Sequence, residues 1–230
     1  MKTIGLIGGM SWESSVVYYQ IINRKVQEIL GGVHSAKTLM YSVEFGEIAK
    51  LQHDGNWTEL QKMMVDAAQR LENGGADFIV LCTNTMHKLA GEIERSVKIP
   101  FLHIADATGE AIKDAGLKKV GLLGTKFTME QDFLKKRLFD KFAIETIIPD
   151  ENDREKVHSI IYNELVKGEI KDDSRKVYLE IIEKLTVNRA EGIILGCTEI
   201  PLLVSNENTN AILFDTTTIH AKKAVEFALK

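Results

Sequence analysis

The chain of 230 residues has few cysteines and no long apolar run. Its two cysteines, Cys82 and Cys197, are too few for a disulfide scaffold, and we expect both to be reduced thiols. No apolar stretch approaches the ~18 residues that a membrane-spanning helix needs. Met1-Lys2-Thr3 leads straight into a strand-like segment without a signal-peptide core. We therefore predict a cytoplasmic protein that has no membrane partner.

Charge of one sign is not concentrated anywhere either. The 29 basic and 33 acidic residues give a formal net charge of −4 and form no basic stripe that would follow a phosphate backbone. The six histidines and two cysteines show no close-set metal-ligand spacing. We expect neither a nucleic-acid partner nor a metal site.

What the sequence does contain is an alternation of short apolar runs and longer helical patterns. Continuous rather than alternating apolar runs are typical of parallel strands that are covered on both faces. The runs cover residues 4–7, 39–43, 78–81, 120–123, 144–148 and 193–195. Between them, residues 60–71 and 177–185 place apolar side chains at helical spacing. The alternation predicts an α/β fold.

The chain also repeats itself. Residues 3–8 (TIGLIG) reappear as 119–124 (KVGLLG), and residues 75–84 match 189–198 in the same register. The repeat predicts two pseudo-symmetric lobes, each a parallel sheet flanked by helices. We place the first lobe at 1–104 plus 212–230 and the second at 105–211. Ligands bind beyond the carboxyl ends of parallel strands, so we expect the active site in the cleft between the lobes.

The matched segments end in polar loops that suit amino-acid chemistry. Residues 81–87 (LCTNTMH) and 196–199 (GCTE) carry hydroxyls, an amide and a carboxylate that can hold an amino and a carboxylate group. A thiol becomes a competent base once its surroundings lower its pKa, for instance at a helix N-terminus. Two bases on opposite faces of a carbon would racemise it without a cofactor. The glycine-rich residues 5–11 predict a tight turn or an anion site before a helix that begins near Trp12 or Glu13.

At these residues the sequence resembles the aspartate/glutamate racemase family, whose members use no pyridoxal cofactor. The resemblance rests on residues 8–10 (GGM), 84–87 (NTMH), 124–125 (GT) and 196–199 (GCTE). It implies two pseudo-symmetric lobes, a catalytic cysteine from each, an amino-acid substrate and a homodimer.

One position departs from the family pattern. The family's first cysteine directly precedes its Asn-Thr pair, where this chain has Thr83. The internal repeat agrees, because it matches Thr83 with Cys197 and leaves Cys82 one residue earlier. Cys82 is then expected to be a buried neighbour, because a shift of one residue at a strand end turns the side chain another way. The pattern is closest to a subgroup specific for L-aspartate and L-glutamate.

The resemblance implies that Cys197 removes the proton from L substrate and that Thr83 serves the other face. Because a hydroxyl is a weaker base than a thiol, we expect L substrates to be turned over well and D substrates poorly. The substrate-binding residues implied by the family are Met10, Ser11, Gln52, Asn84, Thr85, Thr125, Thr198 and Glu199. Lys126 and Lys167 are candidates for binding a distal carboxylate, and if neither reaches the site a neutral side chain such as that of homoserine is favoured.

Other functions are compatible with the same residues. A racemase of broad specificity or one that prefers homoserine would need no basic residue. A decarboxylase with a single cysteine would protonate a carbanion after losing carbon dioxide. A non-catalytic protein could retain amino-acid recognition after losing one of the two bases. A nicotinamide-dependent enzyme is disfavoured because the dinucleotide fingerprint is missing.

Overall fold

The chain folds as two units in the computed structural model, which describes residues 1–230. The first unit comprises Met1–His103 and His220–Lys230, and the second comprises Ile104–Ile219. The repeat placed the return to the first lobe near residue 212. The chain instead stays in the second unit through strand β8 (Leu213–Asp215), because β8 pairs with a strand of that unit.

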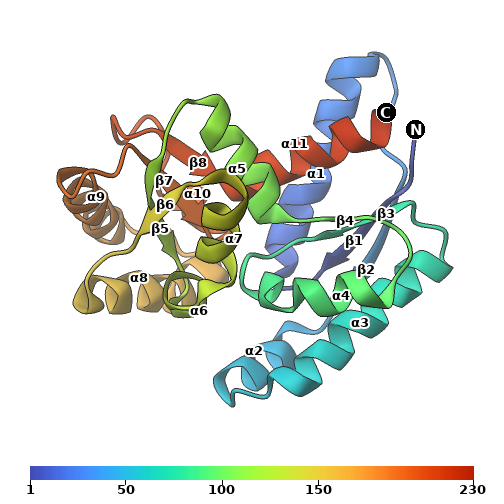
Figure 1. The fold of residues 1–230 in the computed structure, drawn as a ribbon, viewed down its shortest axis with the longest axis horizontal. Coiled ribbons are helices and arrows are strands. Elements are labelled where there is room, and N and C mark those ends of the chain that lie inside the picture. The colour runs from blue at the N-terminus through green and yellow to red at the C-terminus, as the bar shows by residue number, and fades with distance from the viewer. The chain divides into compact units, whose positions relative to one another are not determined.

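The first unit contains four parallel strands in the order β2-β1-β3-β4 (Figure 1). The strands are β1 (Ile4–Gly8), β2 (Thr38–Ser42), β3 (Phe78–Leu81) and β4 (Phe101–Leu102). The helices are α1 (Trp12–Leu30), α2 (Phe45–His53), α3 (Trp57–Asn73), the 3-10 helix η1 (Thr85–Leu89) and α4 (Ala90–Ser96). Helix α11 (Thr216–Leu229) begins in the second unit and enters the first at His220.

Both faces of this sheet are buried, as its continuous apolar strands predict. Successive side chains of β3 point to opposite faces, so Phe78 and Val80 join one core and Ile79 and Leu81 the other. Helices α1 and α11 run side by side over the first of these cores (Figure 1), and α2, α3 and α4 cover the second. Near the chain termini, the Lys2 amide donates to the Ala228 carbonyl at 2.8 Å.

The second unit repeats this topology, with strand order β6-β5-β7-β8 and parallel pairing throughout. The other strands are β5 (Lys119–Gly124), β6 (Glu145–Ile147) and β7 (Gly192–Gly196). The helices are α5 (Ile104–Asp114), α6 (Lys126–Glu130), α7 (Asp132–Phe142), α8 (Glu151–Asn163), the 3-10 helix η2 (Leu165–Lys167), α9 (Asp172–Val187) and α10 (Ile200–Leu203). The predicted duplication and α/β class are therefore confirmed.

In each unit, a carboxylate at a matched position of the repeat accepts hydrogen bonds from backbone amides at the amino end of β1 or β5. Asp77 Oδ2 accepts a hydrogen bond from the Thr3 amide at 2.5 Å. Glu191 Oε2 accepts from the amides of Lys118 and Lys119 at 2.7 and 3.0 Å. Because 77 and 191 are matched positions of the repeat, the duplication extends to individual side-chain contacts.

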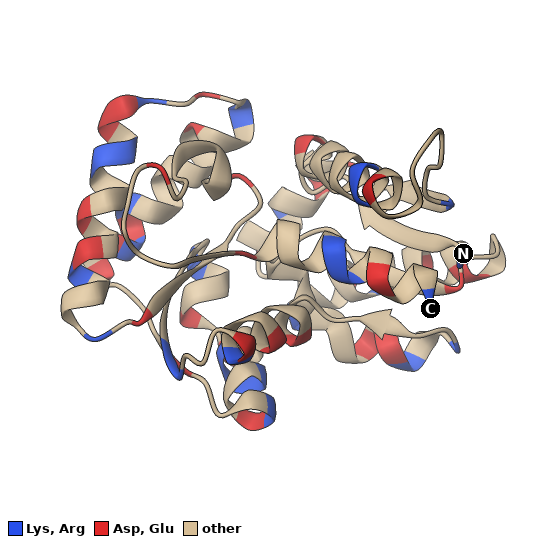
Figure 2. Cartoon of the chain, turned by 90° about the horizontal axis from the view of Figure 1, so that it is seen from above, with Lys and Arg blue, Asp and Glu red and all other residues tan.

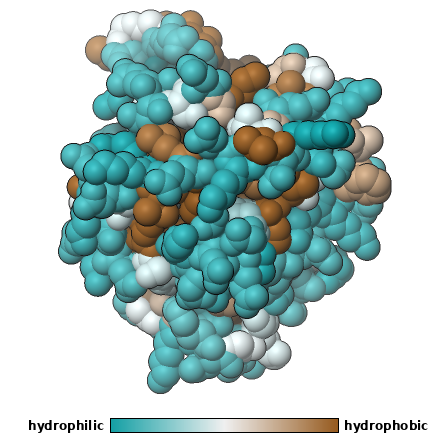
Figure 3. Space-filling view, turned by 90° about the vertical axis from the view of Figure 1, so that its left-hand side faces the viewer, coloured by the Kyte–Doolittle hydropathy of each residue, from teal (hydrophilic) through white to brown (hydrophobic).

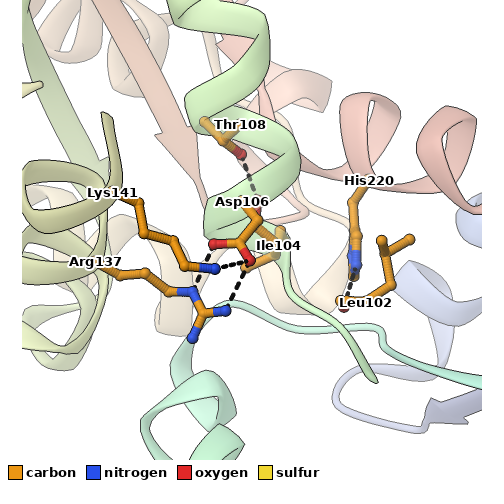
Figure 4. Close-up of polar contacts among 7 residues, drawn as sticks. All are labelled: Leu102, Ile104, Asp106, Thr108, Arg137, Lys141 and His220. Atoms are coloured by element: carbon orange, nitrogen blue, oxygen red, sulfur yellow. Dashed lines mark hydrogen bonds and ion pairs between the residues drawn. The ribbon is translucent and has the colours of Figure 1, made fainter. Parts of the chain in front are cut away.

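An ion network fixes α5 to α7 in the second unit (Figure 4). Arg137 grips the Asp106 carboxylate with two hydrogen bonds of 2.6 and 2.7 Å, and Lys141 adds a third at 2.8 Å. Burial would raise the pKa of the Asp106 carboxyl, but these cationic donors hold that pKa below its ordinary value. The paired arrangement is the geometry in which arginine binds a carboxylate best.

The surface carries both signs of charge. Figure 2 shows Lys and Arg interspersed with Asp and Glu along the helices. Figure 3 shows a face on which hydrophilic residues separate smaller hydrophobic patches. The structure contains no helix with the length and apolarity required to span a bilayer.

Candidate active site

The predicted site residues lie beyond the carboxyl ends of the strands, except Gln52, which comes from α2. All are buried except Cys197, which is partly exposed. The first unit supplies Met10, Ser11, Gln52, Thr83, Asn84 and Thr85. The second unit supplies Thr125, Cys197, Thr198 and Glu199. Each group therefore occupies the end of its sheet where α/β proteins bind ligands.

The sheet registers place Thr83 and Cys197 at equivalent positions. Leu81 is paired with Ile7 of β1, and Leu195 is paired with Leu123 of β5. Both pairs are matched positions of the repeat. Thr83 and Cys197 each follow two residues after the paired leucine, so the residue-by-residue alignment of the two loops is confirmed.

The turn after β1 needs a glycine at residue 9. Gly9 has a φ of +92°, and a Cβ there would lie 2.2 Å from the Val43 carbonyl oxygen. The Gly9 amide donates to Ser15 Oγ at 2.7 Å, which ties the turn to α1. The predicted tight turn is confirmed, and α1 begins at Trp12 as expected. An anion site at this turn stays a prediction.

Similar hydroxyl pairs cap the helices that follow β1 and β5. Ser11 Oγ lies 3.2 Å from Ser14 Oγ and accepts from the Ser14 amide at 3.4 Å. Thr125 Oγ1 lies 3.2 Å from Thr128 Oγ1 and accepts from the Thr128 amide at 3.3 Å. Serine and threonine are favoured at helix N-caps for this reason. These bonds fix both side chains at the carboxyl ends of β1 and β5.

The loop after β3 is closed by hydrogen bonds to its own carbonyls. The His87 amide donates to the Asn84 carbonyl at 3.0 Å, and His87 Nδ1 lies 2.7 Å from the Thr83 carbonyl oxygen. Gln52 Nε2 lies 3.1 Å from Met86 Sδ, which brings α2 against this loop. The first-unit site residues after β3 and on α2 are thus assembled in one place.

Cys82 is a buried core residue, as predicted. Its side chain has no exposed surface and belongs to the core that contains Tyr18 and Ile22 of α1. Burial raises the pKa of the Cys82 thiol well above its ordinary value. A thiol that is neutral and enclosed in this way is a poor base.

Cys197 is the thiol with a polar partner. Its Sγ donates to Glu199 Oε2 at 2.9 Å, and Thr198 Oγ1 donates to the same oxygen at 2.7 Å. We expected surroundings that lower the pKa of this thiol. Burial, and then the Glu199 carboxylate, instead raise the pKa of Cys197 well above its ordinary value, because both disfavour a second negative charge. The thiol is therefore protonated in this structure and donates its hydrogen bond to the Glu199 carboxylate.

Helix α8 adds residues near this loop that the sequence did not single out. Burial, and then the Cys197 and Glu199 groups, raise the pKa of the Tyr162 hydroxyl. The ring of Tyr162 packs against that of His158 at 4.7 Å between centroids, and His158 Nδ1 accepts from the Lys126 amide at 3.2 Å. In the sequence, the one signal for His158 and Tyr162 is their spacing of four residues, which places both rings on one face of a helix.

The surroundings of the two candidate lysines do not indicate a role in binding a distal carboxylate. The Lys126 ammonium forms an ion pair with Glu155 of α8. Lys167 is exposed at the end of η2. The structure contains no group of three or more His, Cys, Asp or Glu side chains that could hold a metal ion.

Comparison with known proteins gives consistent matches along the chain. The sequence profile described as Asp/Glu/hydantoin racemase matches residues 7–224. A solved structure from Yersinia pestis, provisionally described as an Asp/Glu racemase, is 52% identical, with both chains covered over 100% and a TM-score of 0.93. The aspartate racemase homologue PH1733 from Pyrococcus horikoshii is 35% identical over 100% of both chains, with a TM-score of 0.87. The broad specificity amino-acid racemase RacX of Bacillus subtilis is 25% identical over 96% of both chains.

Proposed function

We propose, because this chain belongs to the Asp/Glu/hydantoin racemase family, that it racemises amino acids at the α carbon without a cofactor. The family resemblance noted from the motifs is thereby confirmed. The observation that carries the proposal is the Cys197–Glu199 contact of 2.9 Å at the carboxyl end of β7. It joins a thiol to a proton acceptor at the place where the family has its second cysteine.

We propose that Cys197 acts on the L enantiomer. The S–H proton passes to Glu199 Oε2, which leaves a thiolate. The thiolate then takes the α proton of the substrate, and the bonding electrons stay on the α carbon as a carbanion. The second hydrogen bond to Oε2, from Thr198, holds the carboxylate in line with the thiol. A base held beside its nucleophile is the usual means of activating a thiol of high pKa.

We propose that the Thr83 hydroxyl serves the opposite face. It can donate its proton to the carbanion and recover one from water, but it is a poor base toward a Cα–H bond. L substrates should therefore exchange their α proton with solvent faster than D substrates do. The overall kcat/KM for inversion is the same in both directions, because the two enantiomers have equal free energy. Equal rates of Cα–H exchange for the two enantiomers in heavy water would contradict this assignment.

For the substrate side chain we propose two candidates. The family resemblance favours L-aspartate and L-glutamate. The engagement of Lys126 with Glu155 favours uncharged side chains such as that of homoserine, and RacX is described as a racemase of broad specificity. Aspartate, glutamate and homoserine compared side by side decide between them, since a distal carboxylate without a cationic partner should raise KM strongly.

The proposed function is tested by deuterium exchange at Cα in heavy water. Wild type should label L substrates and form the D enantiomer, and Cys197→Ala should do neither. Binding without any exchange would instead support a non-catalytic amino-acid-binding protein. Carbon dioxide release from a malonate would support the decarboxylase. The cytoplasmic location and the homodimer are further proposals, and analytical ultracentrifugation tests the second.

A further inference from the structure

Three of the six histidines gather in the core of the first unit, although they are far apart in the sequence. They are His87 of η1, His103 after β4 and His220 of α11, with exposed fractions of 2%, 3% and 0%. The ring of His87 lies 4.6 Å from that of His103 and 5.8 Å from that of His220, between centroids. Neither the proposed acid–base steps nor substrate binding uses any of the three.

The protonation of His220 follows from its partners. Its Nε2 lies 2.8 Å from the Leu102 carbonyl oxygen, which only accepts, so Nε2 carries the hydrogen (Figure 4). Burial, opposed by that hydrogen bond, lowers the pKa of His220 to about 4. The ring is therefore neutral near pH 7, and the Tyr18 hydroxyl donates to Nδ1 at 3.0 Å. His220 is thus a fixed, uncharged ring against which His87 packs.

His87 connects this cluster to the Thr83 loop. A carbonyl oxygen accepts only, so Nδ1 of His87 is the donor in its 2.7 Å contact with Thr83. The ring is held by Phe101 at 5.5 Å as well as by the two histidines. Its side chain therefore brings a rigid, buried donor to the backbone of the residue whose hydroxyl is proposed to protonate the substrate.

The rings behind His87 come from the points where the chain leaves and re-enters the unit. His103 is the last residue of the first segment, and His220 is the first residue of the returning one. The His87 side chain is held in place by three other rings. Its hydrogen bond should therefore constrain Thr83 more tightly than a bond from a mobile side chain would.

We propose that His87 is a positioning residue that orients Thr83 for proton return to the face opposite Cys197. The inference rests on the proposed function. Loss of the Nδ1 donor should slow inversion, which requires Thr83, and spare the labelling of L substrate without inversion, which requires only Cys197. A merely structural role would lower both rates together.

The test measures, in heavy water, the ratio of deuterium-labelled L substrate to D product formed from L substrate. His87→Phe keeps the buried ring and removes the donor, so we expect this ratio to rise roughly fivefold or more, as for the loss of one hydrogen bond. His87→Asn places an amide N–H near the position of Nδ1 and should return the ratio toward that of wild type. His103→Phe makes the same substitution beside the loop, leaves the Thr83 bond intact and should keep the wild-type ratio.

An unchanged ratio in His87→Phe, or an equal rise in His103→Phe, would overturn the proposal. If His87→Phe does not accumulate as a folded protein, His87→Leu repeats the measurement with a smaller side chain. Thermal unfolding of each variant verifies the fold. Wild type that labels no substrate would instead refute the proposed function, so the two failures are distinguishable.

Discussion

Acidification should weaken the first unit through His220. The pKa of this imidazole is about 4 in the folded chain against an ordinary value of 6.5. Between these values the unfolded chain binds a proton that the folded chain does not, so folding stability falls as the pH falls through this window. Above pH 6.5 the ring is neutral in both states and the contribution is fully present.

The size of the effect follows from the shift. Each unit of pKa difference is worth about 1.4 kcal/mol, so the whole contribution is about 3 kcal/mol, of which about 2 kcal/mol is lost by pH 5. Urea unfolding of wild type and His220→Gln at pH 7.5 and pH 5 measures it. Glutamine does not titrate, and groups present in both proteins cancel in the comparison.

The quantity to compare is the change in the free energy of unfolding between pH 7.5 and pH 5, in wild type and in His220→Gln. Wild type should lose about 2 kcal/mol more than His220→Gln between the two pH values. The variant itself is expected to be less stable at pH 7.5, because Tyr18 loses its acceptor. Equal pH dependence in the two proteins would show that His220 is not held neutral by the fold, and would refute the reasoning.

Three further substitutions test the remaining structure. Gly9→Ala should cost several kcal/mol and most of the activity, because the new Cβ would meet the Val43 carbonyl and the φ is positive; wild-type thermal stability would contradict this. Cys82→Ala should lower stability by about 1 kcal/mol and preserve kcat, whereas loss of kcat at normal stability would make Cys82 catalytic. Asp106→Asn should cost about 1 kcal/mol in urea unfolding, less at high salt, and a salt-independent loss would argue against the ion network with Arg137.

Much of this architecture could be predicted because the chain contains its own alignment. The repeat of residues 3–8 at 119–124 shows which strands correspond, and the structure pairs them in equivalent registers. That is why Thr83 rather than Cys82 could be matched with Cys197. The boundary near residue 212 was less predictable. A short apolar run such as β8 does not show, from sequence alone, which of two similar sheets it joins.

The pKa of Cys197 could not be predicted from the motif. The sequence shows a carboxylate two residues after the thiol, but not whether the two side chains converge. They do so because Glu199 and Thr198 are both buried in the turn before α10, where Oε2 accepts from both neighbours. Helix α10 has four residues, too few for the helix dipole to act as expected. Similarly, the three buried histidines meet only through the fold.

The two loops also differ at a second matched position, and this suggests how to make the site symmetric. If 83 corresponds to 197, then Thr85 corresponds to Glu199, so the first loop lacks both the thiol and the carboxylate proposed to take its proton. Thr83→Cys alone should raise activity on D substrates only modestly, because the new thiol has no adjacent acceptor. Thr83→Cys combined with Thr85→Glu should raise kcat on D substrates further, roughly tenfold or more over the single variant, as for a positioned general base. Thr85→Glu alone measures any cost to substrate binding through KM. A double variant no faster on D substrates than Thr83→Cys would mean that the carboxylate at Glu199 serves the substrate rather than the thiol.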